Sequence, residues 1–267
     1  MKHLNSYWRV FATGFCFFIF GLGGLILSFI VIPLIKLTTK SEKGSQCKVQ
    51  RTIQQSFDFF CKTMKFMGAI DYKIVGAEKL KQDKECIVVA NHPSLIDYVL
   101  IASQLPRCDC LVKAKIWSNP FMKHIVKAAG YIPNEAPDDL ISLCEERLQQ
   151  GNILLIFPEG TRTTPNKQSK LQRGAAQIAV RTKKDLRLIH IQVSPSFLTK
   201  EAKWYQVPAK KPFFLVEVQG KVKVQPFIEH ATSPNIAARQ LQQHLAEVIF
   251  PSNQKEVGTS GTTTRRN

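Results

Sequence analysis

Residues 91–97 hold the side chains best suited to moving a proton. They read Asn-His-Pro-Ser-Leu-Ile-Asp and directly follow the apolar run 86–90. A carboxylate hydrogen-bonded to one imidazole nitrogen raises the basicity of the other, which a general base needs in order to deprotonate a hydroxyl. His92 and Asp97 are therefore the candidate catalytic pair, and Asn91, Pro93 and Ser94 are candidates for supporting it.

The spacing of this pair requires a turn in the chain. On a continuous helix, residues five apart point about 140° away from each other and cannot touch. Pro93 disfavours helical geometry at His92 and itself suits a first helical turn. We therefore expect His92 at a strand end and Asp97 just inside a helix, close enough to pair. A histidine satisfied near a helix start, with Asp97 complementing the helix dipole, is the alternative reading.

A second polar stretch follows another apolar run. Residues 157–162 read Phe-Pro-Glu-Gly-Thr-Arg after the run 153–157. Gly160 allows unusual backbone geometry, and Arg162 offers a planar fork for a phosphate or carboxylate. Glu159 could hold a sugar or glycerol hydroxyl or orient that arginine. By itself the stretch could also be a structural turn with an ion pair.

The elements that must position these stretches alternate in type. Short β-branched runs predict strands at 72–75, 86–90, 109–112, 153–157, 186–193 and 213–218. Helices are expected at 98–105, from Asn119-Pro120 to Gly130, from Asp138 to near Gly151, and from Ser233-Pro234 to about Ile249. This alternation is typical of an α/β layer fold.

The N-terminal part of the chain predicts a membrane anchor. Residues 10–35 carry no charge, Arg9 and Lys36 bracket them, and 26 such residues can span a bilayer. A cleaved signal peptide is the competing reading, but its apolar region would be shorter. The segment can bend at Gly21, Gly23, Gly24 and Pro33, so a single straight span, a tight hairpin and a half-buried helix all remain open. Excess positive charge after the run predicts that the bulk of the protein lies in the cytoplasm.

The remaining segments complete a division into four parts. Residues 1–45 are the anchor and 46–70 an amphipathic helix, whose apolar stripe either lies in the membrane interface or packs on the core. Residues 71–250 are the catalytic domain, and 251–267 form a polar tail that is expected to be disordered.

Net charge limits the classes of possible partner, and the cysteines bear on whether a metal site is expected. The formal charge of +17 favours an anionic partner. A basic membrane protein that binds nucleic acid would explain that charge, but no nucleic-acid-binding motif is present, so membrane lipids are the expected partner. The seven cysteines are scattered and read as reduced core residues, and the Cys108/Cys110 pair is too closely spaced for the usual zinc site. We expect no metal.

The two polar stretches together resemble the lysophosphatidate (glycerolipid) acyltransferase family, whose signatures are Asn-His, four residues, Asp, and Phe-Pro-Glu-Gly-Thr-Arg. The resemblance covers roughly residues 72–218 and implies a mixed, mostly parallel sheet flanked by helices. It implies that His92 deprotonates the acceptor hydroxyl and that Asp97 orients His92. It also implies that the second motif, with Glu159, Gly160, Thr161 and Arg162, binds the acceptor's phosphate.

Two positions depart from the family pattern. Asn134 stands where an arginine is usual, and His190 stands where proline is common. Lys113, Lys115 and Arg173 could compensate for the missing arginine, and residues 171–176 resemble the family's basic-Gly-Ala segment. The sequence as a whole resembles bacterial members of this family that serve specialised lipid or polyene-lipid pathways.

The reaction expected from this resemblance is direct acyl transfer from acyl-CoA or acyl carrier protein to a lysophospholipid-type hydroxyl. No cofactor is expected, and no Gly-x-Ser-x-Gly nucleophile elbow is present. An acyl-thioesterase that uses His92 to activate water, and an acyltransferase for a polyene or glycolipid acceptor, are the alternatives.

Overall fold

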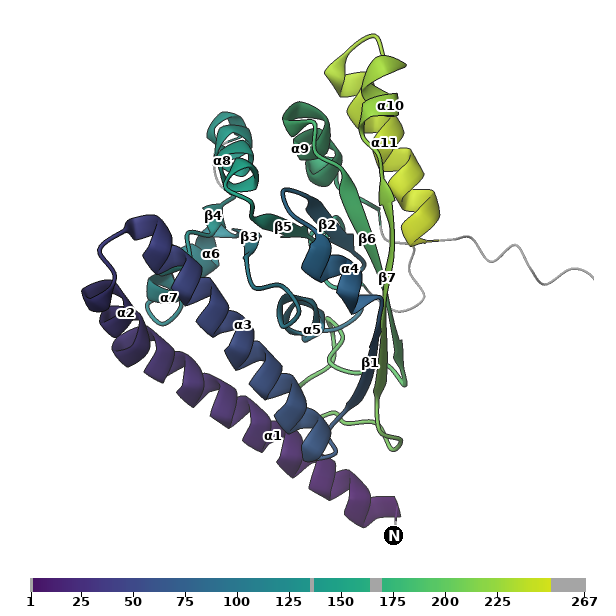
Figure 1. Cartoon of the computed structure of the whole chain (residues 1–267). Helices are drawn as coiled ribbons and strands as arrows, with labels where there is room; N and C mark the ends of the chain where they lie inside the picture. The colour runs from purple at the N-terminus through teal and green to yellow at the C-terminus, as the bar shows by residue number, and fades with distance from the viewer. Residues whose placement is uncertain (1, 135–136, 164–169, 251–267) are drawn as a thin grey trace, which may run out of the picture.

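A seven-stranded sheet forms the centre of the computed structural model, which describes residues 2–134, 137–163 and 170–250 (Figure 1). The strand order is β1-β7-β6-β2-β5-β3-β4, and every neighbouring pair is parallel except β6 and β7. The sheet confirms the predicted mixed, mostly parallel α/β class. The strands are β1 Asp71–Val75, β2 Ile87–Ala90, β3 Cys108–Val112, β4 Ile132–Pro133, β5 Ile153–Ile156, β6 Leu186–Ser194 and β7 Phe213–Val222.

The central strands are apolar along their whole length because both faces of the sheet are covered. All residues of β2 and β5 are buried. This is the pattern expected of parallel strands between two helical layers. Such strands end at a common edge, so the loops that follow β2 and β5 emerge side by side.

Two helical layers cover the sheet (Figure 1). On one face, α3, α4 and α5 contribute Met64, Leu80 and Leu100 to one hydrophobic cluster. On the other, α8, α9 and α11 contribute Leu148, Ile178 and Leu241 to a second cluster. The helices of these layers are α3 Glu42–Phe66, α4 Ala77–Gln82, α5 Asp97–Ala102, α8 Pro137–Gln149, α9 Gly174–Thr182, α10 Gln225–Glu229 and α11 Pro234–Ile249.

The apolar N-terminal run is helical throughout. It comprises α1 Lys2–Ile26, a π-helical turn η1 Leu27–Val31 and α2 Ile32–Thr38. Residues 5–38 have a mean hydropathy of 2.7 and are long and apolar enough to cross a membrane. The chain reverses after Thr38 and not at the glycines 21–24, which removes the tight hairpin from the alternatives. The π turn lies just before Pro33, where a missing N–H is easily accommodated.

The reversal packs the apolar helix along α3. Cys16 of α1 and Met64 of α3 share one buried cluster, and Phe20 lies 4.7 Å from Phe60 between ring centroids. Near the other end of the pair, Ile32 shares a cluster with Val49. The stripe of α3 is therefore buried, so the packing alternative for this helix is the one observed.

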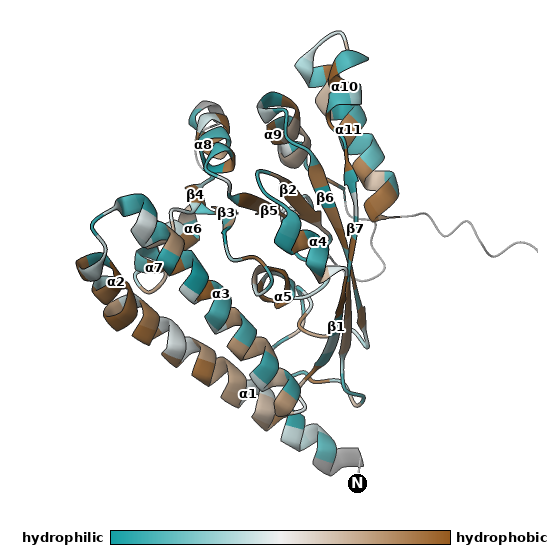
Figure 2. Cartoon of the chain, in the orientation of Figure 1, coloured by the Kyte–Doolittle hydropathy of each residue, from teal (hydrophilic) through white to brown (hydrophobic). Residues whose placement is uncertain are grey.

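The opposite face of the apolar helix is exposed. Large hydrophobic side chains recur on it at steps of three to five residues, at Trp8, Phe11, Phe15, Phe18, Leu22, Leu25, Phe29 and Leu34 among others. Figure 2 shows the hydrophobic colouring of α1 and α2 against the hydrophilic outer face of α3. An uncovered apolar patch of this length marks an interaction surface.

The helix predicted from Asn119 to Gly130 is shorter than expected. Short α6 (Ala114–Trp117) precedes it and α7 (Lys123–Ala128) begins late. The Asn119 side-chain oxygen accepts hydrogen bonds from the N–H groups of Phe121 and Met122, which holds a local turn in place of a helix start. The other predicted elements end within a few residues of those observed, whereas the two-residue β4 has no periodicity that could predict it.

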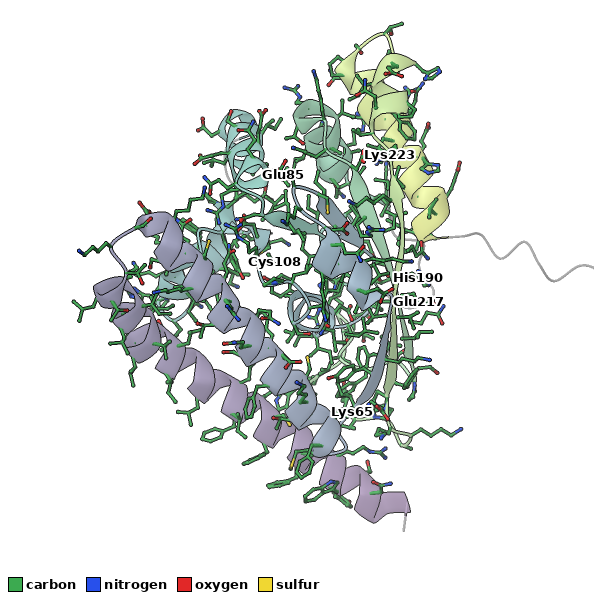
Figure 3. The ribbon with its side chains drawn as sticks, viewed as in Figure 1. Lys65, Glu85, Cys108, His190, Glu217 and Lys223 are labelled. Atoms are coloured by element: carbon green, nitrogen blue, oxygen red, sulfur yellow. The ribbon has the colours of Figure 1, made fainter. Side chains whose placement is uncertain are left out.

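The antiparallel pair β6 and β7 accounts for one of the departures from the family pattern. His190 of β6 lies opposite Glu217 of β7, and Figure 3 shows the two side by side. Burial lowers the pKa of His190, and the Glu217 carboxylate opposes that change. A histidine is accommodated here because its cross-strand neighbour is acidic.

A buried ionic network fastens α3 to the sheet. The Asp109 carboxylate at β3 accepts hydrogen bonds from Arg147 of α8 (Nε to Oδ2, 2.8 Å; Nη2 to Oδ1, 2.9 Å), from Gln50 of α3 and from Asn152. Asp109 is fully buried and the Arg147 side chain is 11% exposed. Removing one partner of such a pair leaves the other charge buried without compensation.

We predict that Asp109→Ala lowers the free energy of unfolding by about 3 to 5 kcal/mol, because it leaves the Arg147 guanidinium buried without its carboxylate partner. Asp58→Ala removes an exposed pair with Lys62 on the same helix layer and should cost less than about 1 kcal/mol. Denaturant unfolding in detergent measures both. Equal losses for the two variants would show that the Asp109 network does not hold the helix layer.

Candidate active site

The two motifs meet at one edge of the sheet. Residues 91–97 follow β2 and residues 157–162 follow β5, and these strands are parallel neighbours with Val89 opposite Ile156. The open edge at the carboxyl ends of parallel strands is where α/β folds build their sites.

His92 and Asp97 are in contact, as the turn at Pro93 predicts. His92 Nδ1 lies 3.1 Å from Asp97 Oδ2. The chain between them is irregular, and α5 begins only at Asp97. The Ser94 N–H also donates to Asp97 Oδ2, at 2.6 Å. The carboxylate is thus held by the same turn that brings it to the imidazole.

Asp97 lies in a dry environment. It is fully buried, and burial raises the pKa of its carboxyl to about 6, although hydrogen bonds from His92 and Ser94 oppose the rise. A carboxylate with so little access to water interacts strongly with the neighbouring imidazole. Its charge depends on pH near neutrality.

The His92 ring is fixed in place yet accessible. It stacks on Phe157 with 4.2 Å between ring centroids and an interplanar angle of 23°, and its side chain is 18% exposed. An ionised Asp97 favours a proton on Nδ1, which leaves the Nε2 lone pair free. This arrangement can accept a proton from a hydroxyl at Nε2.

Glu159 joins the two motifs. Its Oε1 accepts from the His92 N–H at 2.8 Å, and its Oε2 accepts from Thr163 Oγ1 at 2.7 Å. The Thr163 N–H donates in turn to the His92 carbonyl at 2.7 Å. Glu159 is buried, and neither carboxylate oxygen pairs with Arg162. Its observed contacts are those of a brace between the loops.

Arg162 is held by main-chain carbonyls. Its Nη1 donates to Leu198 at 3.0 Å and to Thr199 at 2.9 Å, in the loop between β6 and β7. The side chain is half-buried. The edge formed by Nε and Nη2 carries further donors and has the geometry to bind an anion.

The supporting residues of the motifs have separate positions. Asn91 exchanges two hydrogen bonds with the main chain of Ile191 on β6, at 2.8 and 2.7 Å, which fixes the end of β2. Pro93 lies at the turn, and the Ser94 hydroxyl is fully buried without a hydrogen-bond partner among the residues that the structure describes. Gly160 has φ +67°, which favours glycine, and Thr161 is exposed.

Some of the predicted site residues do not lie at the His92–Asp97 pair. Lys115 is exposed in α6, and it is Lys113 Nζ that reaches the Gly160 carbonyl, at 3.0 Å. Arg173 lines a separate cavity of about 780 Å³ between the start of α9 and α11, together with Lys170, Arg239, Gln242 and Phe250. None of the residues from 91 to 97 lines that cavity. Asn134 is exposed just after β4.

Sequence reasoning missed three contributors to the site: Thr163, Leu198 and Thr199. Thr163 directly follows the second motif, so its position offered a signal. Leu198 and Thr199 act through their carbonyls, which no side-chain pattern reveals. Over the described residues, the structure has no group of three or more His, Cys, Asp or Glu side chains arranged to hold a metal ion.

Comparison with known proteins finds similarity over the region that holds both motifs. The family model described as Acyltransferase matches residues 71–197, which contain both motifs. The chain is 29% identical over 115 residues to a chloroplastic 1-acyl-sn-glycerol-3-phosphate acyltransferase of Brassica napus, covering 41% of this chain and 33% of that protein. It is 34% identical over 82 residues to the Helicobacter pylori enzyme of the same name, covering 28% and 35%. The matches thus span about a third of these two relatives.

Two longer similarities extend the comparison. A 1-acyl-sn-glycerol-3-phosphate acyltransferase of Pseudomonas aeruginosa is 23% identical over 160 residues, covering 58% of this chain and 59% of that protein. The crystal structure of the 1-acyl-sn-glycerophosphate acyltransferase of Thermotoga maritima superposes with a TM-score of 0.69 at 18% identity, over 93% of this chain and 95% of that one. At that identity the structural likeness supports the fold.

We predict that Glu159→Ala destabilises the protein by about 2 kcal/mol. Alanine removes both acceptor oxygens, so the His92 N–H and the Thr163 hydroxyl lose their partner inside the protein. Glu247→Ala, at an exposed position of α11, is the control and should change stability by less than about 0.5 kcal/mol. Thermal unfolding compares the two, and a Glu159→Ala protein as stable as the control would contradict the brace.

Proposed function

Because the family model described as Acyltransferase matches residues 71–197, we propose that this chain transfers a fatty acyl group from a thioester donor to a hydroxyl of a lysophospholipid-type acceptor at a membrane surface. The observation that carries the proposal is the His92–Asp97 contact of 3.1 Å beside the second motif. The donor is acyl-CoA or acyl carrier protein. The named relatives support a glycerolipid acceptor.

The reaction follows from the free Nε2 of His92. As the acceptor oxygen attacks the thioester carbonyl, its proton passes to Nε2, and the buried Asp97 stabilises the imidazolium that forms. When the tetrahedral intermediate collapses, the C–S bond breaks and the imidazolium returns the proton to the leaving thiolate. The products are an ester and a thiol, with no acyl-enzyme. A general base of this kind contributes about 10² to 10⁴ in rate.

Arg162 is proposed to recognise the acceptor head group. Its Nη1 is fixed by two carbonyls, which leaves the Nε and Nη2 edge with a defined direction. A pre-oriented guanidinium loses less conformational entropy when it binds a phosphate. The cation of Lys113, held at the Gly160 carbonyl, adds positive charge beside the same loop.

The exposed stripe of α1 and α2 is proposed to hold the enzyme on the membrane. Since the opposite face of this helix is packed on α3, the helix lies along the domain with one apolar face turned outward. An amphipathic arrangement of this kind suits a helix embedded in one leaflet. Burial of each large side chain of the stripe contributes roughly 1.5 to 3 kcal/mol. We propose the cytoplasmic face of the inner membrane as its location.

The assay that tests this function offers the purified protein a panel of phosphorylated and neutral lipid alcohols with each donor, and identifies products by mass spectrometry. Acylated acceptor is the expected product. Release of free fatty acid at the same rate with and without acceptor would instead identify a thioesterase.

We predict that His92→Ala lowers kcat/KM at least about 10²-fold while the protein stays folded and membrane-bound. His230→Ala, at an exposed position after α10, should leave activity unchanged. Retention of more than a tenth of the wild-type activity by His92→Ala would refute its role as the base.

The raised pKa of Asp97 adds a pH dependence to the same reaction. Only the ionised carboxylate orients and stabilises His92, so activity should fall as the pH drops through about 6. The limb belongs to the coupled pair. Asp97→Asn should lower kcat/KM at pH 8 and remove the part of the limb that comes from the carboxylate. A wild-type rate that is constant from pH 7.5 to pH 5 would contradict this account.

We predict that Arg162→Lys raises the KM for a phosphorylated acceptor or lowers its turnover by about tenfold, with the donor KM nearly unchanged. Lysine keeps the charge but cannot bridge two carbonyls and a phosphate in one plane. Arg181→Lys, on the exposed side of α9, is the matched control. Equal wild-type kinetics for phosphorylated and neutral acceptors, together with tolerance of Arg162→Lys, would direct the search to uncharged lipid alcohols.

A further inference from the structure

The loop between β6 and β7 is long and rooted in the core. Residues 195–212 connect the two strands, and near the start of the loop Phe197 and Leu198 are 1% and 2% exposed. In Figure 1 this green connection runs from the sheet toward α1 and lies near α5. A loop anchored in this way can present the residues beyond Leu198 in a defined place.

The exposed part of this loop, residues 199–211, combines aromatic and basic side chains, and we call it the basic-aromatic tip. Trp204 and Tyr205 are 49% and 46% exposed, and their rings pack edge to face at 5.7 Å. The tip holds four lysines, at 200, 203, 210 and 211, against the single acid Glu201, a net charge of +3. Lys211 pairs with Asp71, whereas the other three make no ion pair within the described part of the chain.

The tip adjoins the apolar face of α1. The Arg9 guanidinium donates to the Ala209 carbonyl. A Cβ placed on Gly14 would lie 3.0 Å from the Trp204 ring, so the indole packs where α1 has no side chain. Phe11 and Phe18, one turn to either side of Gly14, are exposed. Trp204 therefore continues the apolar surface of the helix at its N-terminal half.

The root of the same loop reaches the candidate active site. The Leu198 carbonyl accepts from Arg162 and from the Leu95 N–H, and the Thr199 carbonyl accepts from Arg162. One segment thus touches the surface of α1, the second motif and the turn that carries His92. Whatever fixes the tip also fixes the seat of Arg162.

We propose that the basic-aromatic tip binds the head-group layer of an anionic bilayer and thereby sets the depth of Arg162 relative to the membrane surface. Tryptophan and tyrosine favour the bilayer interface, and lysines beside it are attracted to anionic lipids. The inference rests on the proposed membrane placement of α1, because the tip continues that apolar face. It assigns the tip the role of placing the acceptor site at head-group level.

The depth of the tip is measured in full-length protein with a single tryptophan. Trp8→Phe with Trp117→Phe leaves Trp204 as the reporter on the tip, and Trp117→Phe with Trp204→Phe leaves Trp8 as the reporter on α1. Each is mixed with vesicles of phosphatidylcholine and phosphatidylglycerol (70:30) whose acyl chains carry bromine near the head group. Quenching of both reporters is the expected result.

The charge of the tip is tested by removing three lysines. Lys200→Gln, Lys203→Gln and Lys210→Gln together should lower the preference of the protein for these vesicles over pure phosphatidylcholine vesicles at least about tenfold. Lys81→Gln, Lys84→Gln and Lys183→Gln remove the same charge from exposed positions at the other end of the sheet and should change the preference less than about threefold. Lys211 is left in place because of its pair with Asp71.

The outcomes distinguish the role of the basic-aromatic tip from the membrane placement of α1. Quenching of Trp8 without quenching of Trp204 would overturn the role of the tip and leave the proposed membrane enzyme intact. Quenching of neither reporter would refute both the tip and the membrane placement of α1. Equal effects of the two lysine triples would show that the tip does not read anionic lipid, which also overturns the inference.

Discussion

The site depends on one buried carboxylate that joins two loops. β2 and β5 end side by side because they are parallel neighbours, and this brings the His92 turn next to the second motif. Glu159 then fixes the distance between them by accepting from the His92 N–H and the Thr163 hydroxyl. A main-chain hydrogen bond from the Thr163 N–H to the His92 carbonyl adds to this link between the two loops.

Burial determines the chemistry of the pair. Asp97 lies at the start of α5 without access to water, while His92 on the same turn keeps part of its ring accessible. The low local dielectric raises the pKa of the carboxyl and strengthens its effect on the imidazole. The stack on Phe157 restrains the ring in that position. In the proposed reaction, the acceptor hydroxyl therefore meets a base whose proton site is already assigned.

Buried polar and apolar contacts connect the N-terminal apolar helix to the sheet that carries the site. Asp109, Arg147 and Gln50 tie α3 to the sheet, and α1 packs along α3. Arg9 on the inward face of α1 meets the β6–β7 loop, whose root holds Arg162. The outward apolar face, the loop and the second motif are thus connected by direct contacts. This connection gives the proposed acceptor site a defined place relative to a membrane.

The amino-acid sequence by itself determined six of the seven strands, several of the helices and the two motifs. Apolar runs predicted the main strands, Ser233-Pro234 predicted the start of α11, and Pro93 predicted that His92 and Asp97 could meet, because each of these follows from local backbone preferences. Tertiary structure alone decided that α3 buries its apolar stripe and that Glu159 braces the two loops. It also decided that Arg173 lines a cavity to which residues 91–97 do not contribute. It also decided that the carbonyls of Leu198 and Thr199 hold Arg162. Those contacts join segments far apart in the chain, often through main-chain atoms that every residue shares, so no local pattern of side chains encodes them.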